Sequence, residues 1–76
     1  MHIRVEHYFG HLGMRMPHRL QFDGRHIKVL EILDQWHGPD HRYVKVKCDD
    51  GCFYILRYDM AREDWELTMF DSGSRN

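Results

Sequence analysis

Two histidines and two cysteines have the spacing of a zinc site. Three residues separate His37 from His41, and three separate Cys48 from Cys52. Tetrahedral zinc sites bring such imidazole and thiolate ligands together at about 2.0–2.3 Å from the metal. However, Gly38-Pro39 prevents the histidines from sharing a helix face, and the order of the pairs is reversed relative to a common zinc finger. We therefore favour a loop with solvated histidines beside two sheet thiols, and we assign no metal or other cofactor.

The same cysteines could form a disulfide or supply a nucleophile. Cys48 and Cys52 face each other across a predicted hairpin, at a separation that permits a disulfide. The small number of cysteines and the absence of a secretory signal favour free thiols in a reducing cytoplasm. The only serines are Ser72 and Ser74, near the C-terminus, so a cysteine with a histidine is the one possible nucleophile–base pair. No residue fixes its geometry, and we predict a protein that is not an enzyme and has no catalytic residues.

Two pairs of carboxylates are better explained by structure than by acid–base chemistry. Asp49-Asp50 and Glu63-Asp64 both fall in predicted turns, where aspartate forms hydrogen bonds with the local backbone. The six glycines are scattered singly, so they form no phosphate-binding loop.

Basic and aromatic residues alternate in the second half of the chain. A strand pattern would gather five of them on one face: Tyr43, Lys45, Lys47, Phe53 and Arg57. Aromatic rings among cations bind single-stranded nucleic acids without reading their sequence. Glu66 on the same face and the net charge of -1 weaken that interpretation, because affinity for phosphates comes from a basic excess.

Alternating apolar residues predict the strands that position these side chains. Residues 3–9 indicate a half-buried strand, and Gly10 to Pro17 indicate a loop with three breakers. A short strand over 19–22 precedes Asp23-Gly24, which suits a type I′ hairpin turn. The run 26–36 then forms the next strand.

The run 26–36 changes its apolar parity part-way. Ile27 and Val29 are odd-numbered, whereas Leu30, Ile32 and Trp36 are even-numbered. A β-bulge near residues 30–31 would produce this change. A short helix is the competing interpretation, but the β-branched content favours a strand.

The remaining residues predict a three-stranded meander. Strands over 43–48 and 52–58 are joined by Asp49-Asp50-Gly51, and a polar connection over 60–64 leads to a last strand over 65–70. The two hairpin registers place one apolar set on a common core face. This set is Val44, Val46, Tyr54, Leu56, Tyr58, Trp65, Leu67 and Met69. The opposite face is half apolar, so we expect the N-terminal strand or a second subunit to cover part of it.

Together the strands predict an all-β fold: a small, strongly bent antiparallel sheet or an SH3-like partial barrel of five to six short strands. Residues 1–70 would form a single β-rich domain, and residues 71–76 would form a disordered tail. No run of about 20 apolar residues suggests a membrane span.

Several segments resemble a bacterial family of small uncharacterised proteins. These segments are residues 22–36, 38–46, 50–51, 54–59 and 65–70. The resemblance covers about residues 19–70, with a weaker match at 5–10. The pattern of a strand, Asp-Gly and a second strand, followed by Trp and a final aromatic residue, is also similar to the C-terminal tail domain of Y-family polymerase-like accessory proteins. That similarity implies a DNA-proximal or docking role, and it transfers no catalytic or ligand residue.

We therefore expect a cytoplasmic, non-enzymatic protein-interaction module, with a homodimer as one possible assembly. The alternative is a nucleic-acid-associated β-domain. In either case the predicted partner-binding face is Tyr43, Lys45, Lys47, Phe53, Ile55, Arg57 and Phe70.

Overall fold

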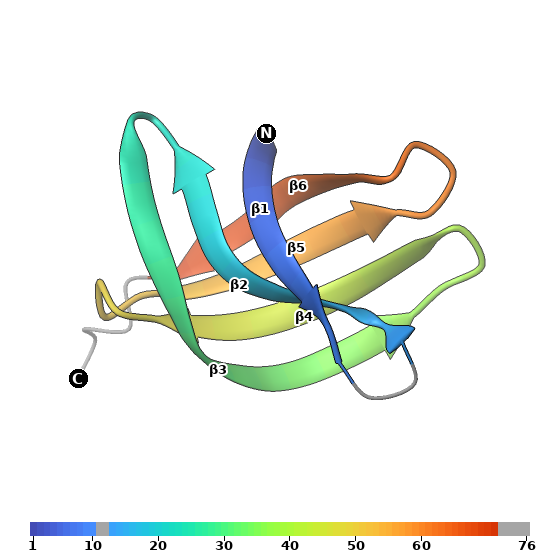
Figure 1. Cartoon of the computed structure of the whole chain (residues 1–76), viewed down its shortest axis with the longest axis horizontal. Coiled ribbons are helices and arrows are strands. Elements are labelled where there is room, and N and C mark those ends of the chain that lie inside the picture. The colour runs from blue at the N-terminus through green and yellow to red at the C-terminus, as the bar shows by residue number, and fades with distance from the viewer. Residues whose placement is uncertain (11–12, 72–76) are drawn as a thin grey trace.

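Within the residues that the structure describes, six antiparallel strands form a small closed β-barrel, which confirms the all-β prediction. A computed structural model of the chain describes residues 1–10 and 13–71, the last two of these by their backbone alone. The strands follow one another around the barrel in chain order (Figure 1). Their bounds are β1 His2–Phe9, β2 Arg15–Phe22, β3 Arg25–His37, β4 His41–Cys48, β5 Phe53–Asp59 and β6 Asp64–Asp71.

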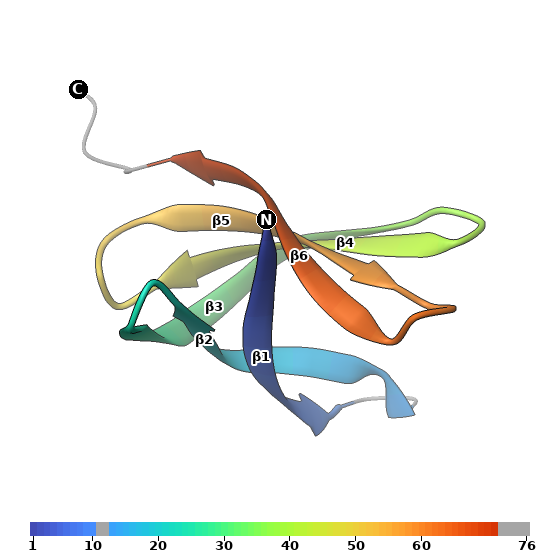
Figure 2. The ribbon, with the colours of Figure 1, turned by 90° about the horizontal axis from the view of Figure 1, so that it is seen from above.

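The long strand β3 bends and joins two layers of the barrel. Its first half pairs with β2, and its second half pairs with β4 (Figure 1). The barrel closes where β1 meets β6, through the pairs His2–Glu66 and Ile3–Trp65. Seen from above, β1 crosses beside β6 at this short seam (Figure 2). The N-terminal strand therefore completes the barrel, so a partial barrel becomes a closed one.

Both tight hairpins have the predicted geometry. Asp23 and Gly24 take φ angles of 52° and 70°, the left-handed values that a type I′ turn requires. Leu20 consequently pairs with Ile27, as expected from a two-residue turn. Gly51 takes a φ of 83° and donates its amide hydrogen to the Cys48 carbonyl at 3.1 Å. The loop over 49–51 thus fixes the register of β4 against β5.

The predicted loop over 10–17 is wrong at its end, because β2 begins at Arg15. Pro17 was interpreted as a breaker, yet it lies fully buried within β2, opposite His7 where the β1–β2 register shifts. The pairing of β2 with β3 begins only at Arg19. Proline is tolerated here because it lies at a bulge and precedes the residues of β2 that pair with β3, so its missing amide hydrogen removes no bond of the β2–β3 ladder.

The strand interpretation of residues 26–36 is confirmed, but its predicted parity is wrong in part. The register of β3 against β4 shifts twice, first between Val29 and Glu31 and again between Ile32 and Asp34. The first shift is the predicted bulge, and the second was not foreseen. As a result Leu30 and Trp36, which we expected to point inward, are 58% and 43% exposed.

A further bulge changes the end of β6. Leu56 pairs with Leu67 as predicted, but Ile55 pairs with Met69, which leaves Thr68 as an extra residue. The Thr68 hydroxyl donates a hydrogen bond to the Ile55 carbonyl at 3.0 Å. Met69 therefore turns outward and is 60% exposed, so its placement in the core and its predicted pairing with Tyr54 are both wrong.

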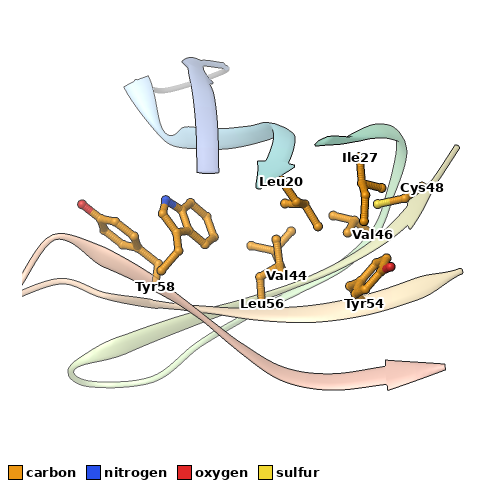
Figure 3. Packing of buried hydrophobic residues seen from close by; sticks show 9 residues of the cluster. Leu20, Ile27, Val44, Val46, Cys48, Tyr54, Leu56 and Tyr58 are labelled. Atoms are coloured by element: carbon orange, nitrogen blue, oxygen red, sulfur yellow. The ribbon is translucent and has the colours of Figure 1, made fainter. Parts of the chain in front are cut away.

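The core lies between β1–β2 on one side and β4–β6 on the other (Figure 3). Its buried members are Leu20, Ile27, Val44, Val46, Cys48, Tyr54, Leu56, Tyr58 and Trp65. Ile3 and Val5 of β1 pack against this cluster from its open side. The expectation that the N-terminal strand covers the outward face of the meander is therefore wrong, because β1 covers the inner face instead.

In the residues that the structure describes, no helix is long and apolar enough to cross a membrane. Asp71, which we assigned to the tail, is the last residue of β6. The rest of the predicted tail lies outside the described residues.

Candidate functional site

The four residues of the alternative zinc interpretation do not meet. His41 begins β4 and Cys48 ends it, so the strand rise separates the histidine pair from the cysteine pair by on the order of 20 Å. The His41 imidazole instead lies 3.6 Å from the Asp59 carboxylate. Among the described residues, no three histidine, cysteine, aspartate or glutamate side chains are grouped to hold a metal ion. The zinc interpretation is thus excluded for this set.

Both cysteines are free thiols, so the disulfide alternative is not realised. Cys48 is completely buried in the core. Burial, followed by the negative charges of Asp50 and Asp49, raises the pKa of its thiol to about 12. Burial also raises the pKa of the Cys52 thiol. Thiols of this kind are poor nucleophiles, because the thiolate is the reactive form.

Slow thiol modification follows from this environment. We expect Cys48, retained as the only cysteine in a Cys52→Ser variant, to react with a chromogenic disulfide reagent at pH 8 at least ~100-fold more slowly in the folded protein than in urea. The measurement is the absorbance of the released aromatic thiolate over time. Equal rates in the two states would show that Cys48 is accessible and ionised, and would contradict its place in the core.

The aspartate pair in the β4–β5 hairpin holds the turns together, as the sequence indicates. Asp50 accepts hydrogen bonds from the Tyr54 hydroxyl at 2.5 Å and from the Cys52 amide at 3.0 Å. It also forms an ion pair with Arg25 of the other hairpin at 3.2 Å. Asp49 accepts a hydrogen bond from the Lys28 amide. These contacts connect two hairpins that are distant in sequence.

The predicted partner-binding residues do lie together on the outward side of β4 and β5. We call this set the outer surface: Tyr43, Lys45, Lys47, Phe53, Ile55 and Arg57. Tyr43, Lys45 and Lys47 pair directly with Arg57, Ile55 and Phe53 respectively. The side chain of Phe70, the seventh predicted member, lies outside the described residues.

A shallow apolar hollow lies at the centre of the outer surface. Lys45, Phe53, Ile55 and Met69 line it, and its volume is about 180 Å³. This volume is below the 300–1,000 Å³ of pockets that enclose a drug-sized ligand, so it suits one large apolar side chain. Met69 belongs to the hollow only because of the bulge at Thr68. The alternation of apolar residues in the sequence places Met69 on the core face, so it could not predict that Met69 lines the hollow.

The charges around the hollow fall into two groups. Arg57 is engaged: a hydrogen bond with Tyr43, then one with Glu66, raises the pKa of its guanidinium. The ammonium groups of Lys45 and Lys47 lie 5.9 and 6.0 Å from the centre of the Phe53 ring. Neither lysine forms an ion pair with a described carboxylate. The hollow is thus bordered by two cations that form no ion pair with any carboxylate that the structure describes.

Acidic residues occupy the neighbouring strand. Glu31 pairs with Lys47 and Asp34 pairs with Lys45 across the β3–β4 ladder. On β6, Glu66 pairs with Arg57. The cations of β4 and β5 therefore have carboxylates on the strands at both sides. The face as a whole is therefore amphipathic and of mixed charge, and it is not a continuous basic patch.

Comparisons with protein-family models, with curated proteins and with solved structures found no match. The resemblance to a bacterial family and to polymerase accessory domains stays a prediction. Function must be inferred from the geometry of the sites themselves.

Sequence reasoning missed one buried charged residue. Arg42 is only 4% exposed, and burial lowers the pKa of its guanidinium. We began the strand at Tyr43. Extending the same alternation by one residue places Arg42 inward with Val44 and Val46, and this signal was present in the sequence.

Proposed function

We propose that this protein is a non-enzymatic protein-interaction module that uses its outer surface. The observation that carries the proposal is the apolar hollow between Phe53, Ile55 and Met69, open to solvent and bordered by two lysines that form no ion pair with a described carboxylate. Binding surfaces concentrate their affinity in a small apolar centre with a polar rim. The matching partner is a segment that places one large apolar side chain in the hollow and a carboxylate beside Lys45 or Lys47.

A protein partner fits this surface better than a nucleic acid. A phosphate backbone would follow a row of cations, but Glu31 and Asp34 lie directly beside the two lysines. Arg57 is already paired with Glu66. The net charge of -1 gives no long-range attraction for a polyanion. An acidic group on a short segment requires only a local cation, which the lysines supply.

A display library of random linear peptides provides the probe. We expect the wild-type protein to select peptides in which Asp or Glu lies within a few positions of a large apolar residue. Ile55→Asp should lower the affinity for the selected peptides at least ~10-fold, because it places a charge in the hollow. The double variant Lys45→Glu/Lys47→Glu should lower the affinity by a similar factor, because it repels the peptide carboxylate. Fluorescence anisotropy with a labelled selected peptide measures both effects.

The matched control is Leu30→Asp, which adds the same charge at an exposed bulge of β3, outside the outer surface. It should leave peptide affinity unchanged, and circular dichroism should show that all variants keep the β fold. Failure to select any peptide, or equal binding by Ile55→Asp, would overturn the proposal. Light scattering that shows a dimer abolished by Ile55→Asp would instead identify a second copy of this chain as the occupant.

Single-stranded nucleic acid is the second candidate, and the two lysines beside the Phe53 ring favour it. A labelled oligothymidylate titration at low salt tests it. Binding that weakens steeply with added salt and disappears in Lys45→Glu/Lys47→Glu would support this candidate over the first. The absence of binding at low salt would remove it.

A further inference from the structure

The guanidinium of Arg42 is buried without an acidic partner among the side chains that the structure describes. Its Nη2 atom donates a hydrogen bond to the backbone carbonyl of Arg15 and lies 3.6 Å from the Met16 sulfur. Its Nε atom is buried and has no hydrogen-bond partner. No carboxylate among the described side chains forms an ion pair with it. Buried cations are normally paired, because a charge removed from water is unfavourable.

Two aromatic side chains next to Arg42 also carry unused polar atoms. Tyr58 and Trp65 are 5% and 4% exposed, and their ring centres lie 4.9 Å apart. The Arg42 guanidinium carbon is 5.9 Å from the Trp65 ring. The Tyr58 hydroxyl and the Trp65 indole nitrogen are both buried without a partner. In Figure 3 the Tyr58 hydroxyl points away from Leu56, at one end of the core cluster.

The chemistry of these three atoms specifies their missing partner. An arginine Nε–H and an indole N–H can only donate hydrogen bonds, and a tyrosine hydroxyl can donate as well as accept. A ligand that satisfies all three must therefore bring acceptor oxygens. Arginine is the side chain best suited to such oxygens, because its planar fork matches carboxylate and phosphate groups.

An open hollow lies beside Arg42 and Tyr58. Arg42, Tyr58 and Arg15 line it together with His37 and Met60, and its volume is about 260 Å³. The Arg15 guanidinium carbon lies 5.5 Å from the Tyr58 ring, so a second cation borders the space. No carboxylate lines this hollow among the described residues. We call this space the Arg42 pocket.

An adjoining hollow of about 310 Å³ shares Arg15 and Tyr58 with the Arg42 pocket and includes Trp65. Glu63 and Asp64 also line this second space. Asp64 lies 3.8 Å from His2 and 3.9 Å from Arg62, so basic groups already accompany it. The two carboxylates therefore line the second hollow, whereas the described charged residues of the Arg42 pocket are the arginines Arg15 and Arg42.

We propose that the Arg42 pocket is a binding site for an oxyanion, the carboxylate or phosphate group of a small molecule, held beside Tyr58 by the guanidinium groups of Arg42 and Arg15. Such a ligand would supply the counter-charge that Arg42 lacks among the described residues. None of the residues that line this site belongs to the outer surface. The proposal therefore does not depend on the proposed function.

The two tryptophans allow a direct test by nuclear magnetic resonance. Trp65 lies next to Arg42 and Tyr58, which line the site, whereas Trp36 is 43% exposed on β3 and serves as the internal reference. Sodium phosphate and sodium acetate are titrated separately into the ¹⁵N-labelled protein at constant ionic strength. We expect a saturable shift of the Trp65 indole N–H resonance and none of the Trp36 resonance. A response to phosphate alone identifies a phosphate site, and a response to acetate identifies a carboxylate site.

Variants separate the proposed role from simple packing. Arg42→Met keeps an unbranched side chain and removes the charge, and it should lower the affinity for the anion at least ~10-fold. Arg15→Met should also lower the affinity for the anion. This second variant keeps the test valid if Arg42→Met does not fold. Arg57→Met, which removes a cation from the outer surface, should change nothing. No saturable Trp65 shift with either anion, or affinities unchanged in Arg42→Met and Arg15→Met, would overturn the proposal.

Discussion

Replacement of Leu56 by alanine should lower the free energy of unfolding by about 2–5 kcal/mol. Leu56 is completely buried and pairs with Val44 on one side and Leu67 on the other, so its removal leaves a cavity in the middle of the barrel. A chain of 76 residues has a total stability of roughly 4–11 kcal/mol at typical values per residue. The substitution therefore removes a large part of the stability, and urea denaturation followed by tryptophan fluorescence measures it.

Leu30→Ala is the matched control for this prediction. It makes the same chemical change at a β3 bulge, where the side chain is 58% exposed. Exposed substitutions of this kind alter stability by about 0.5 kcal/mol or less. A comparable loss in both variants would mean that the β3 bulges do not turn Leu30 outward, and that the strand follows the simpler parity of its sequence.

The parts of the fold that depend on local chemistry could be predicted from the sequence. Asp23-Gly24 and Asp49-Asp50-Gly51 each restrict the backbone to one turn, and the turn then fixes the register of its strands. The inward placement of Val44, Val46 and Leu56 followed directly from those registers. The pairing of Arg57 with Glu66 followed from the same argument.

Features set by closure of the barrel could not be predicted in the same way. The extra residues at Leu33 and Thr68 let β3 and β6 bend, and a bulge is decided by the curvature that the whole sheet must adopt. The contact between β1 and β6 joins residues more than sixty positions apart, and no local pattern encodes it. The outward placement of Met69, and with it the hollow of the outer surface, depends on one of these bulges.

Arg42 illustrates a different limit. A charged residue at the start of a strand is normally read as solvent-exposed, because arginine is almost never fully buried without a partner. Only the closed barrel shows that Tyr58 and Trp65 cover it. The donor groups around it are a property of three strands that meet, so the candidate anion site is visible in the structure and not in the sequence.

Removal of the Asp50 carboxylate by Asp50→Ala should cost about 2–4 kcal/mol of unfolding free energy. The carboxylate accepts hydrogen bonds from Tyr54 and from the Cys52 amide, and it forms an ion pair with Arg25. Each hydrogen bond contributes about 1–1.5 kcal/mol net. The ion pair, whose arginine is 54% exposed, adds at most about 1 kcal/mol, and the three contacts are lost together. Asp49→Ala, the neighbouring control, loses a single hydrogen bond from the Lys28 amide and should cost about 1 kcal/mol.

The pH dependence of this effect has a definite sign. Burial acts to raise the pKa of Asp50, but the hydrogen bonds from Tyr54 and Cys52 outweigh it, so the pKa in the folded state lies below the ordinary value of 3.8. A depressed carboxyl pKa stabilises the fold fully above the unfolded value, and this contribution is lost as the pH falls through the folded value. The stability difference between wild type and Asp50→Ala should thus be constant from pH 7 to about pH 5 and should shrink below about pH 4. Urea denaturation at each pH measures it, and a difference that grows on acidification would show that the folded protein binds the carboxyl group in its protonated form.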